Sequence, residues 1–71
     1  MDRITQVLVE ARKAAGLTQQ QLAEHLGIAQ PTLAQIETGR RPLPRERYGM
    51  LPKAIRRRVI EAAIAELKTL R

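Results

Sequence analysis

The sequence of 71 residues contains no cysteine, tryptophan or phenylalanine, and Tyr48 is its one aromatic residue. Without cysteine the chain can form neither a disulfide nor a thiolate metal site, and the single histidine, His25, cannot form a metal cluster. No apolar run reaches the roughly 18 residues that span a membrane, and the N-terminus lacks a signal-peptide pattern. We therefore expect a cytoplasmic protein whose core is aliphatic. We expect it to contact no membrane and to bind no metal, other cofactor or small-molecule ligand.

Positive charge dominates the chain but is unevenly distributed. The net charge is +6, and residues 1–39 carry three bases against four acids while residues 40–71 carry ten against three. A positive second half favours a polyanionic partner whose phosphates are held by the segments after residue 39. The alternative is that these bases only keep a small domain soluble.

Helical patterning extends along the whole chain. Apolar residues recur at helical spacing, which predicts an all-α single domain over residues 1–71, a compact bundle of about five helices. The first helix begins at Asp2 or Thr5 and runs to about Ala15. A short fourth helix begins near Pro44, a favourable first helical residue, and ends before Pro52. The last helix covers residues 53–70.

Residues 18–38 carry the densest set of local signals. Thr18 has the residue type of an N-cap, and Gln21 completes a capping box three positions later. Gly27 follows the last apolar residue of the second helix, where a left-handed turn residue is expected. A third helix begins near Gln30, with Pro31 tolerated in its first turn. The pattern predicts two short helices joined by a tight turn.

The spacing within residues 19–37 resembles the helix-turn-helix of the lambda-repressor-like family, of the Cro and XRE type. The family's structural positions are filled by small Ala23 at the helix crossing, by Gly27 in the turn, and by aliphatic residues at 22, 26, 28, 33 and 36. The chain departs from the family at Ala29, because the third helix usually opens with a Ser or Thr that can cap it. An ordinary helical hairpin of a protein-binding relative remains the alternative.

The third helix has an outward face without charge. That face cannot hold DNA by Coulomb attraction, but it suits the reading of base edges, because glutamine can bond adenine and small side chains can approach a thymine methyl. The resemblance matches Gln30 and Gln35 to base-contacting positions, whereas neutral surface filler is the alternative. Relatives often carry a polar side chain at Pro31, which puts one contact in doubt. The candidate base-reading residues are Gln30, Pro31, Thr32, Ala34 and Gln35.

Candidate phosphate ligands flank this helix. Arg40 and Arg41 follow it in a loop that contains two prolines, and Arg45 opens the next segment; all three are suited to phosphate oxygens. The resemblance adds Gln19, at the start of the second helix, as a residue that contacts phosphate and supports the recognition helix.

The resemblance also implies an ion pair between Arg12 and Glu37, which would hold the first helix against the third. Two solvated surface charges are the alternative.

The last helix carries more apolar surface than a small domain needs. Its apolar residues cover about half the helical circumference, and the surplus consists chiefly of Ile60, Ile64 and Leu67. We interpret this surplus as a homodimer interface, while closure of the domain's own core is the alternative. The run Arg56–Arg58 lies near the positive end of the helix dipole, and we expect a modest, nonspecific contact of this run with DNA.

These features favour a sequence-specific regulator of double-stranded DNA, a repressor that binds an inverted-repeat operator as a homodimer. An antitoxin that binds its own operator is the alternative, although such proteins usually need a further toxin-wrapping segment. The residues show no nucleophilic triad, phosphate-cradling glycine loop or carboxylate cluster, so we do not expect an enzyme.

Overall fold

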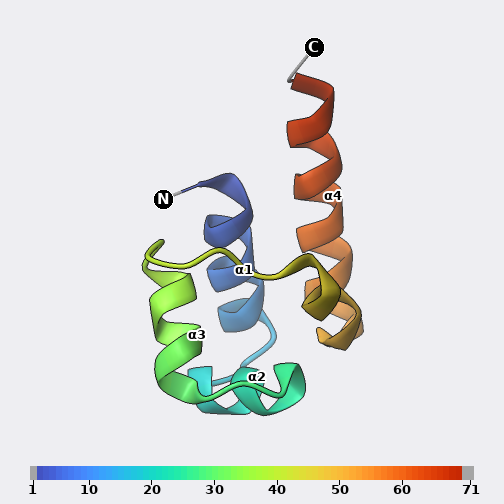
Figure 1. Cartoon of the computed structure of the whole chain (residues 1–71). Helices are drawn as coiled ribbons and strands as arrows, with labels where there is room; N and C mark the ends of the chain where they lie inside the picture. The colour runs from blue at the N-terminus through green and yellow to red at the C-terminus, as the bar shows by residue number, and fades with distance from the viewer. Residues whose placement is uncertain (1, 70–71) are drawn as a thin grey trace.

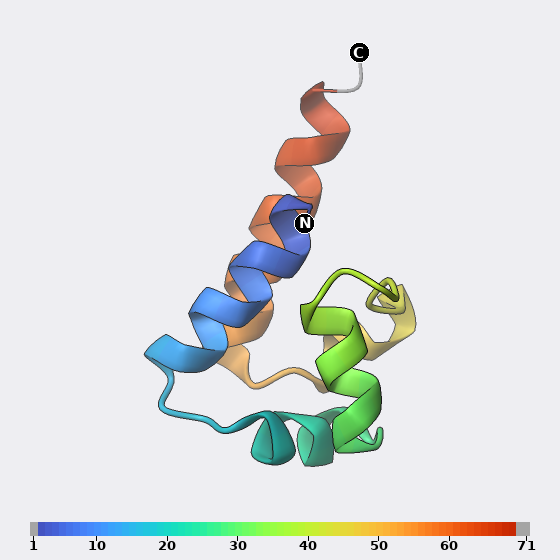
Figure 2. The same ribbon diagram turned by 90° about the vertical axis from the view of Figure 1, so that its left-hand side faces the viewer.

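The computed structural model describes residues 2–69 and has an all-α fold, as the patterning predicts (Figure 1). Helix α1 lies beside α4, while α2 and α3 form a pair joined by a tight turn (Figure 2). The second half of α4 extends beyond the other helices (Figure 1). In chain order the elements are α1 (Arg3–Ala14), α2 (Gln19–Leu26), α3 (Gln30–Glu37), the 3₁₀ helix η1 (Arg45–Met50) and α4 (Lys53–Thr69).

Aliphatic side chains from every α-helix meet in one core. Burial of this apolar surface is the main favourable term that holds such a small domain together. Tyr48 packs against the core from η1, and burial raises the pKa of its hydroxyl above the usual value. The side chains with the least exposure are Leu8, Leu22, Leu26, Leu33, Ile36, Ile55 and Val59.

The helix starts follow the local signals closely. Asp2 is the N-cap of α1, because its side chain accepts a hydrogen bond from the Thr5 N–H at 2.7 Å, while Thr5 itself is buried. Thr18 and Gln21 form the reciprocal capping box of α2, with bonds of 2.9 and 3.1 Å. Helix α2 ends at Gly27, whose φ of 67° is left-handed. Each cap satisfies N–H or C=O groups that have no partner inside the helix.

Helix α3 lacks such a cap. Ala29 occupies the N-cap position without a side-chain hydrogen bond, and Pro31 lies in the first turn. The proline removes one N–H that would otherwise need a partner. The first turn is closed instead by the Thr32 and Leu33 N–H groups, which donate to the Ala29 carbonyl at 3.0 and 3.1 Å.

The segment after α3 differs from the expected fourth α-helix. It is a 3₁₀ helix, Arg45–Met50, and Pro44 precedes it instead of forming its first residue. Pro52 keeps Leu51 extended at φ −68° and ψ 145°, so too few residues remain for a stable α-helix. The last helix begins at Lys53 as expected, whereas its expected end at residue 70 lies outside the described residues.

Candidate nucleic-acid interface

Helix α3 divides into an inward and an outward side. Leu33 and Ile36 are buried, whereas Pro31 and Gln35 are exposed on the opposite side. Thr32 and Ala34 lie at the edges of the outward side and are half-buried. At 100° per residue these positions form one continuous uncharged surface along the helix. Its exposed part, Pro31 and Gln35, is open to a ligand.

Gln30 is exposed at the start of α3, and one hydrogen bond holds its side chain. Its Nε2 donates to Gln19 Oε1 at 2.8 Å, and Gln19 Nε2 in turn donates to Glu37 Oε1 at 2.9 Å. The Gln30 carbonyl oxygen and one amide hydrogen remain unused by this bond. The bond to Gln19 therefore fixes the direction in which Gln30 can offer a donor and an acceptor.

Glu37 connects this chain of hydrogen bonds to α1. Arg12 Nε donates to Glu37 Oε2 at 2.7 Å, and Arg12 Nη2 donates to Glu37 Oε1 at 3.1 Å. Arg12 Nη1 also donates to the Leu17 carbonyl at 2.8 Å. The two side chains are 11% and 5% exposed, so this is a buried bidentate pair in which the ionised groups are well supplied with partners.

The four side chains Arg12, Glu37, Gln19 and Gln30 form a continuous network, which we call the Gln30 support. It spans α1, α2 and α3, and no described buried side-chain nitrogen or oxygen lacks a partner. A buried polar network favours one packing arrangement only when each of its polar groups has a hydrogen-bond partner. Arg12 and Glu37, the buried members of the Gln30 support, meet that condition, and the network ties α3 to α1 and α2.

The loop after α3 begins with a tight attachment to the helix. The N–H groups of Arg40 and Arg41 both donate to the Gln35 carbonyl, at 2.9 and 3.3 Å, and Gly39 has a left-handed φ of 81°. Both arginine side chains are exposed. Arg41 and Thr32 line the same shallow hollow, so the loop adjoins one edge of the outward side of α3. Cationic groups thus stand beside an uncharged helix face, an arrangement suited to phosphate and base edges respectively.

The Arg45 side chain lines a different hollow from those of Arg40 and Arg41. It lines a groove with Tyr48 and with the Ala63, Glu66 and Leu67 side chains of α4, whereas Arg41 lines the hollow beside α3. The position of Arg45 follows from the 3₁₀ turn, which carries residues 45–50 away from α3 and towards α4.

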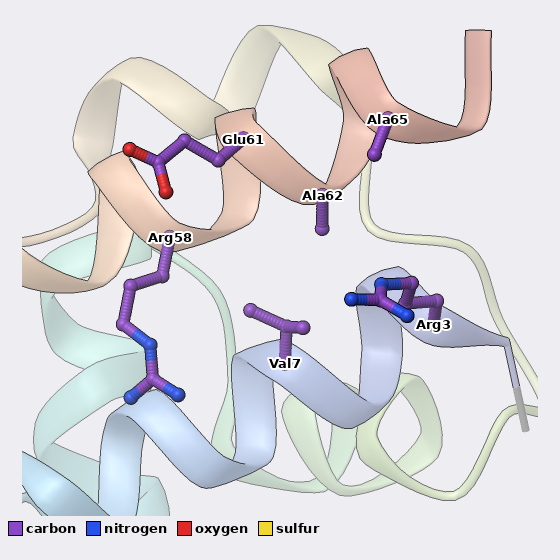
Figure 3. A pocket seen from close by; sticks show the side chains of 6 residues that line it. All are labelled: Arg3, Val7, Arg58, Glu61, Ala62 and Ala65. Atoms are coloured by element: carbon purple, nitrogen blue, oxygen red, sulfur yellow. The ribbon is translucent and has the colours of Figure 1, made fainter. Parts of the chain in front are cut away.

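The three arginines at the start of α4 point in different directions. Arg56 Nη1 reaches the Gly49 carbonyl at 3.5 Å, and Arg57 Nε reaches Glu61 Oε1 at 3.4 Å on the solvent side. Arg58 extends along α1 in a groove that also contains Arg3 (Figure 3). Successive helical residues are separated by 100°, so the run forms no single basic patch.

Sequence reasoning missed the contribution of Arg47. Its Nη1 donates to the Leu26 carbonyl at the end of α2, at 3.0 Å, and so ties η1 to the helix-turn-helix. A basic side chain near a helix C-terminus is a known way to satisfy a terminal carbonyl. Here that side chain comes from another element, 21 residues away in sequence, and no local pattern could have indicated it.

Paired helices with a left-handed glycine turn, an exposed uncharged second helix and an arginine loop beside it define a helix-turn-helix DNA-binding domain. The family model described as "Helix-turn-helix domain" matches residues 4–71, and the chain belongs to this Cro/XRE-like family. The resemblance inferred from residues 19–37 is thereby confirmed. No curated protein and no solved structure matches the chain.

Within residues 2–69, no helix is long and apolar enough to cross a bilayer. The same residues contain no cluster of three or more acidic, histidine or cysteine side chains that could hold a metal ion.

Proposed function

We propose that the protein is a transcriptional repressor that binds an inverted-repeat operator as a homodimer. Helix α3 enters the major groove, where the outward side chains Gln30 and Gln35 read base edges. Family membership supports the role of a DNA-binding regulator. The operator, the dimer and the repression are our proposal.

The Gln30 support is the observation that carries base reading. A surface glutamine that only kept the domain soluble would need no fixed direction. Here the Gln30 amide is held by Gln19, which is held by the buried Glu37. A side chain that is already oriented loses little entropy when it binds. Its remaining donor and acceptor match the bidentate pattern by which glutamine recognises adenine.

Phosphate binding in this proposal comes from outside α3. Arg40 and Arg41 project from a loop whose first N–H groups are tied to Gln35 and whose course is restricted by Pro42 and Pro44. Gln19, at the start of α2, adds a polar contact on the other side of the recognition helix. Contacts of this kind set register and affinity without sequence preference.

The exposed apolar residues of α4 support a two-fold dimer in this proposal. A dimer through α4 would present two α3 helices to successive major grooves about 34 Å apart, so each half-site would be the inverted copy of the other. A protein bound across a promoter excludes polymerase from it. Repression then depends on the concentration of the protein and on its dimerisation.

Selection of bound duplexes from a random pool tests the proposal. We expect an inverted repeat whose half-site centres are one helical turn apart, with adenine enriched at one position per half-site. The variant Gln20→Ala, an exposed glutamine of α2, is the matched control and should select the same repeat. A pool that remains random after repeated selection at low salt would refute sequence-specific binding. A single, unrepeated half-site would refute the symmetric operator.

A further inference from the structure

A groove runs between η1 and the second half of α4. Its floor is formed by Ile4 of α1 and Tyr48 of η1 together with Ala63 and Leu67 of α4, and Arg45 and Glu66 stand beside it. We call it the η1–α4 groove. Apolar side chains contribute most of its lining.

Leu67 belongs both to the lining of this groove and to a set of exposed apolar residues on α4. Ile60, Ile64 and Leu67 are 38%, 46% and 62% exposed. At 100° per residue the three positions fall within an arc of about 60°, on the side of the helix that borders the groove. The second half of α4 extends beyond the other helices (Figure 1), and Ile64 and Leu67 in that half are left exposed by their own domain.

Charge distinguishes this groove from the pockets that border α1 and α3. The groove between α1 and α4 carries two guanidinium groups, of Arg3 and Arg58, while its Glu61 already pairs with Arg57 (Figure 3). The hollows beside α3 carry Arg40 and Arg41, and in one of them these two bases outnumber a single acid, Asp2. A second copy of a chain with a net charge of +6 would be repelled at either place.

The η1–α4 groove instead has one charge of each sign. Neither Arg45 nor Glu66 forms an ion pair with another residue in the range 2–69. A two-fold interface brings a surface against itself, so a residue that contacts another across the axis is contacted by it in return. One base and one acid around an apolar centre make such a surface self-complementary.

We propose that the η1–α4 groove receives α4 of a second copy of this chain, with Arg45 of each protomer paired to the partner's Glu66. This inference rests on the homodimer of the proposed function and gives that dimer an interface. Burial of Ile60, Ile64 and Leu67 supplies the driving force. The two charge pairs fix the orientation of the protomers, and Arg45 acts in self-association instead of in phosphate binding.

Sedimentation equilibrium of charge-reversal variants tests the pairing. We expect the wild-type protein to be a reversible dimer. Arg45→Glu and Glu66→Arg should each weaken dimerisation by roughly tenfold, because symmetry repeats each like-charge contact twice. The double variant restores opposite charges and should return to within about threefold of wild type. Arg58→Glu and Glu10→Arg make the same charge changes away from the groove and should leave dimerisation within about threefold of wild type.

Far-UV circular dichroism identifies any variant that does not fold, and Ile64→Asp, an exposed position, provides a second route to the monomer. A wild-type protein that is monomeric at every concentration would overturn the inference. A double variant that is as weak as the product of the two single variants would overturn the pairing. Binding of a labelled duplex is measured separately, so a monomer that still recognises DNA overturns this interface and leaves DNA recognition standing.

Discussion

Removal of the Glu37 carboxylate should destabilise the domain more than any surface change, because this carboxylate is buried and hydrogen-bonded. Glu37 accepts two hydrogen bonds from Arg12 and one from Gln19, and its side chain is 5% exposed. In Glu37→Ala the guanidinium of Arg12 stays buried without a counter-charge. A buried pair broken in this way typically costs about 3–5 kcal/mol.

That cost is large compared with the stability of a domain of 71 residues. At roughly 0.05–0.15 kcal/mol per residue, the free energy of unfolding is about 4–11 kcal/mol. Glu37→Ala should therefore lower the melting temperature by more than about 12 °C, since 1 kcal/mol shifts it by about 4–8 °C in a domain of this size.

Urea unfolding of the wild type, Glu37→Ala and a double variant identifies the cause of the stability loss. The double variant Arg12→Met with Glu37→Leu removes both charges and should be close to wild type in stability, because apolar side chains of similar size replace the pair. The double variant also deprives Gln19 of its acceptor, so its affinity for the selected operator should fall about fivefold, the equivalent of one hydrogen bond of about 1 kcal/mol.

A loss below about 1 kcal/mol in Glu37→Ala would refute the argument, because it would mean that water replaces the carboxylate and that the pair is effectively solvated. A double variant that is as unstable as Glu37→Ala would refute the assignment of the loss to the uncompensated charge of Arg12.

The remaining predictions concern single sites. Gln35→Ala should cost about 1–3 kcal/mol on the selected operator and relax discrimination at one base step, measured by titration of operator and random duplexes. Arg40→Ala should weaken binding to both duplexes alike and reduce the slope of log affinity against log salt by about 1. The pKa of Asp2 is lowered mainly by the hydrogen bond from the Thr5 N–H. The ionised Asp2 therefore stabilises the fold fully above about pH 3.8, and this stabilisation is lost as the pH falls through the lower pKa of the folded state. In Asp2→Asn the free energy of unfolding, measured by urea titration, should depend less on pH in this acid range. Gly27→Ala should cost about 1–2 kcal/mol through its left-handed φ, plus a further loss because the new Cβ would lie 3.3 Å from Arg47 Nη1.

Each of these predictions has an outcome that would contradict it. Equal losses on operator and random DNA in Gln35→Ala would exclude base reading, and an unchanged salt slope in Arg40→Ala would remove that residue from the phosphate contacts. An acid slope that persists in Asp2→Asn would assign it to another carboxyl group. Gly16→Ala has a similar φ of 73° but open space around the new Cβ, so equal losses at the two glycines would discount the contact with Arg47.

The helices could be predicted because their signals are local. The capping box of Thr18 and Gln21 and the left-handed Gly27 act within a few residues, and the apolar spacing reports the buried side of each helix directly. The segment after α3 could not be assigned in the same way. Whether Pro44 opens an α-helix depends on Pro52 and on the packing of Tyr48 against the core, which are tertiary effects.

The candidate site shows the same limit. The outward side of α3 follows from its periodicity, so the exposure of Gln35 was predictable from spacing alone. A run of charged residues says less about where its side chains lie than apolar spacing does, because the direction of each side chain depends on its position around the helix and on packing. Arg56, Arg57 and Arg58 are adjacent in sequence, yet they lie on three sides of α4. The Arg12–Glu37 pair joins residues 25 positions apart, and only the family resemblance suggested it.

The unequal anchoring of the two glutamines on α3 has a consequence for how binding preference can change. Gln30 is tied through Gln19 to a buried carboxylate, so its replacement disturbs the contacts between three helices. The Gln35 side chain is exposed and enters none of the side-chain hydrogen bonds of residues 2–69. New operators should therefore be reached first by substitution at Gln35, where a mutant can exchange one base for another while its folding is left intact.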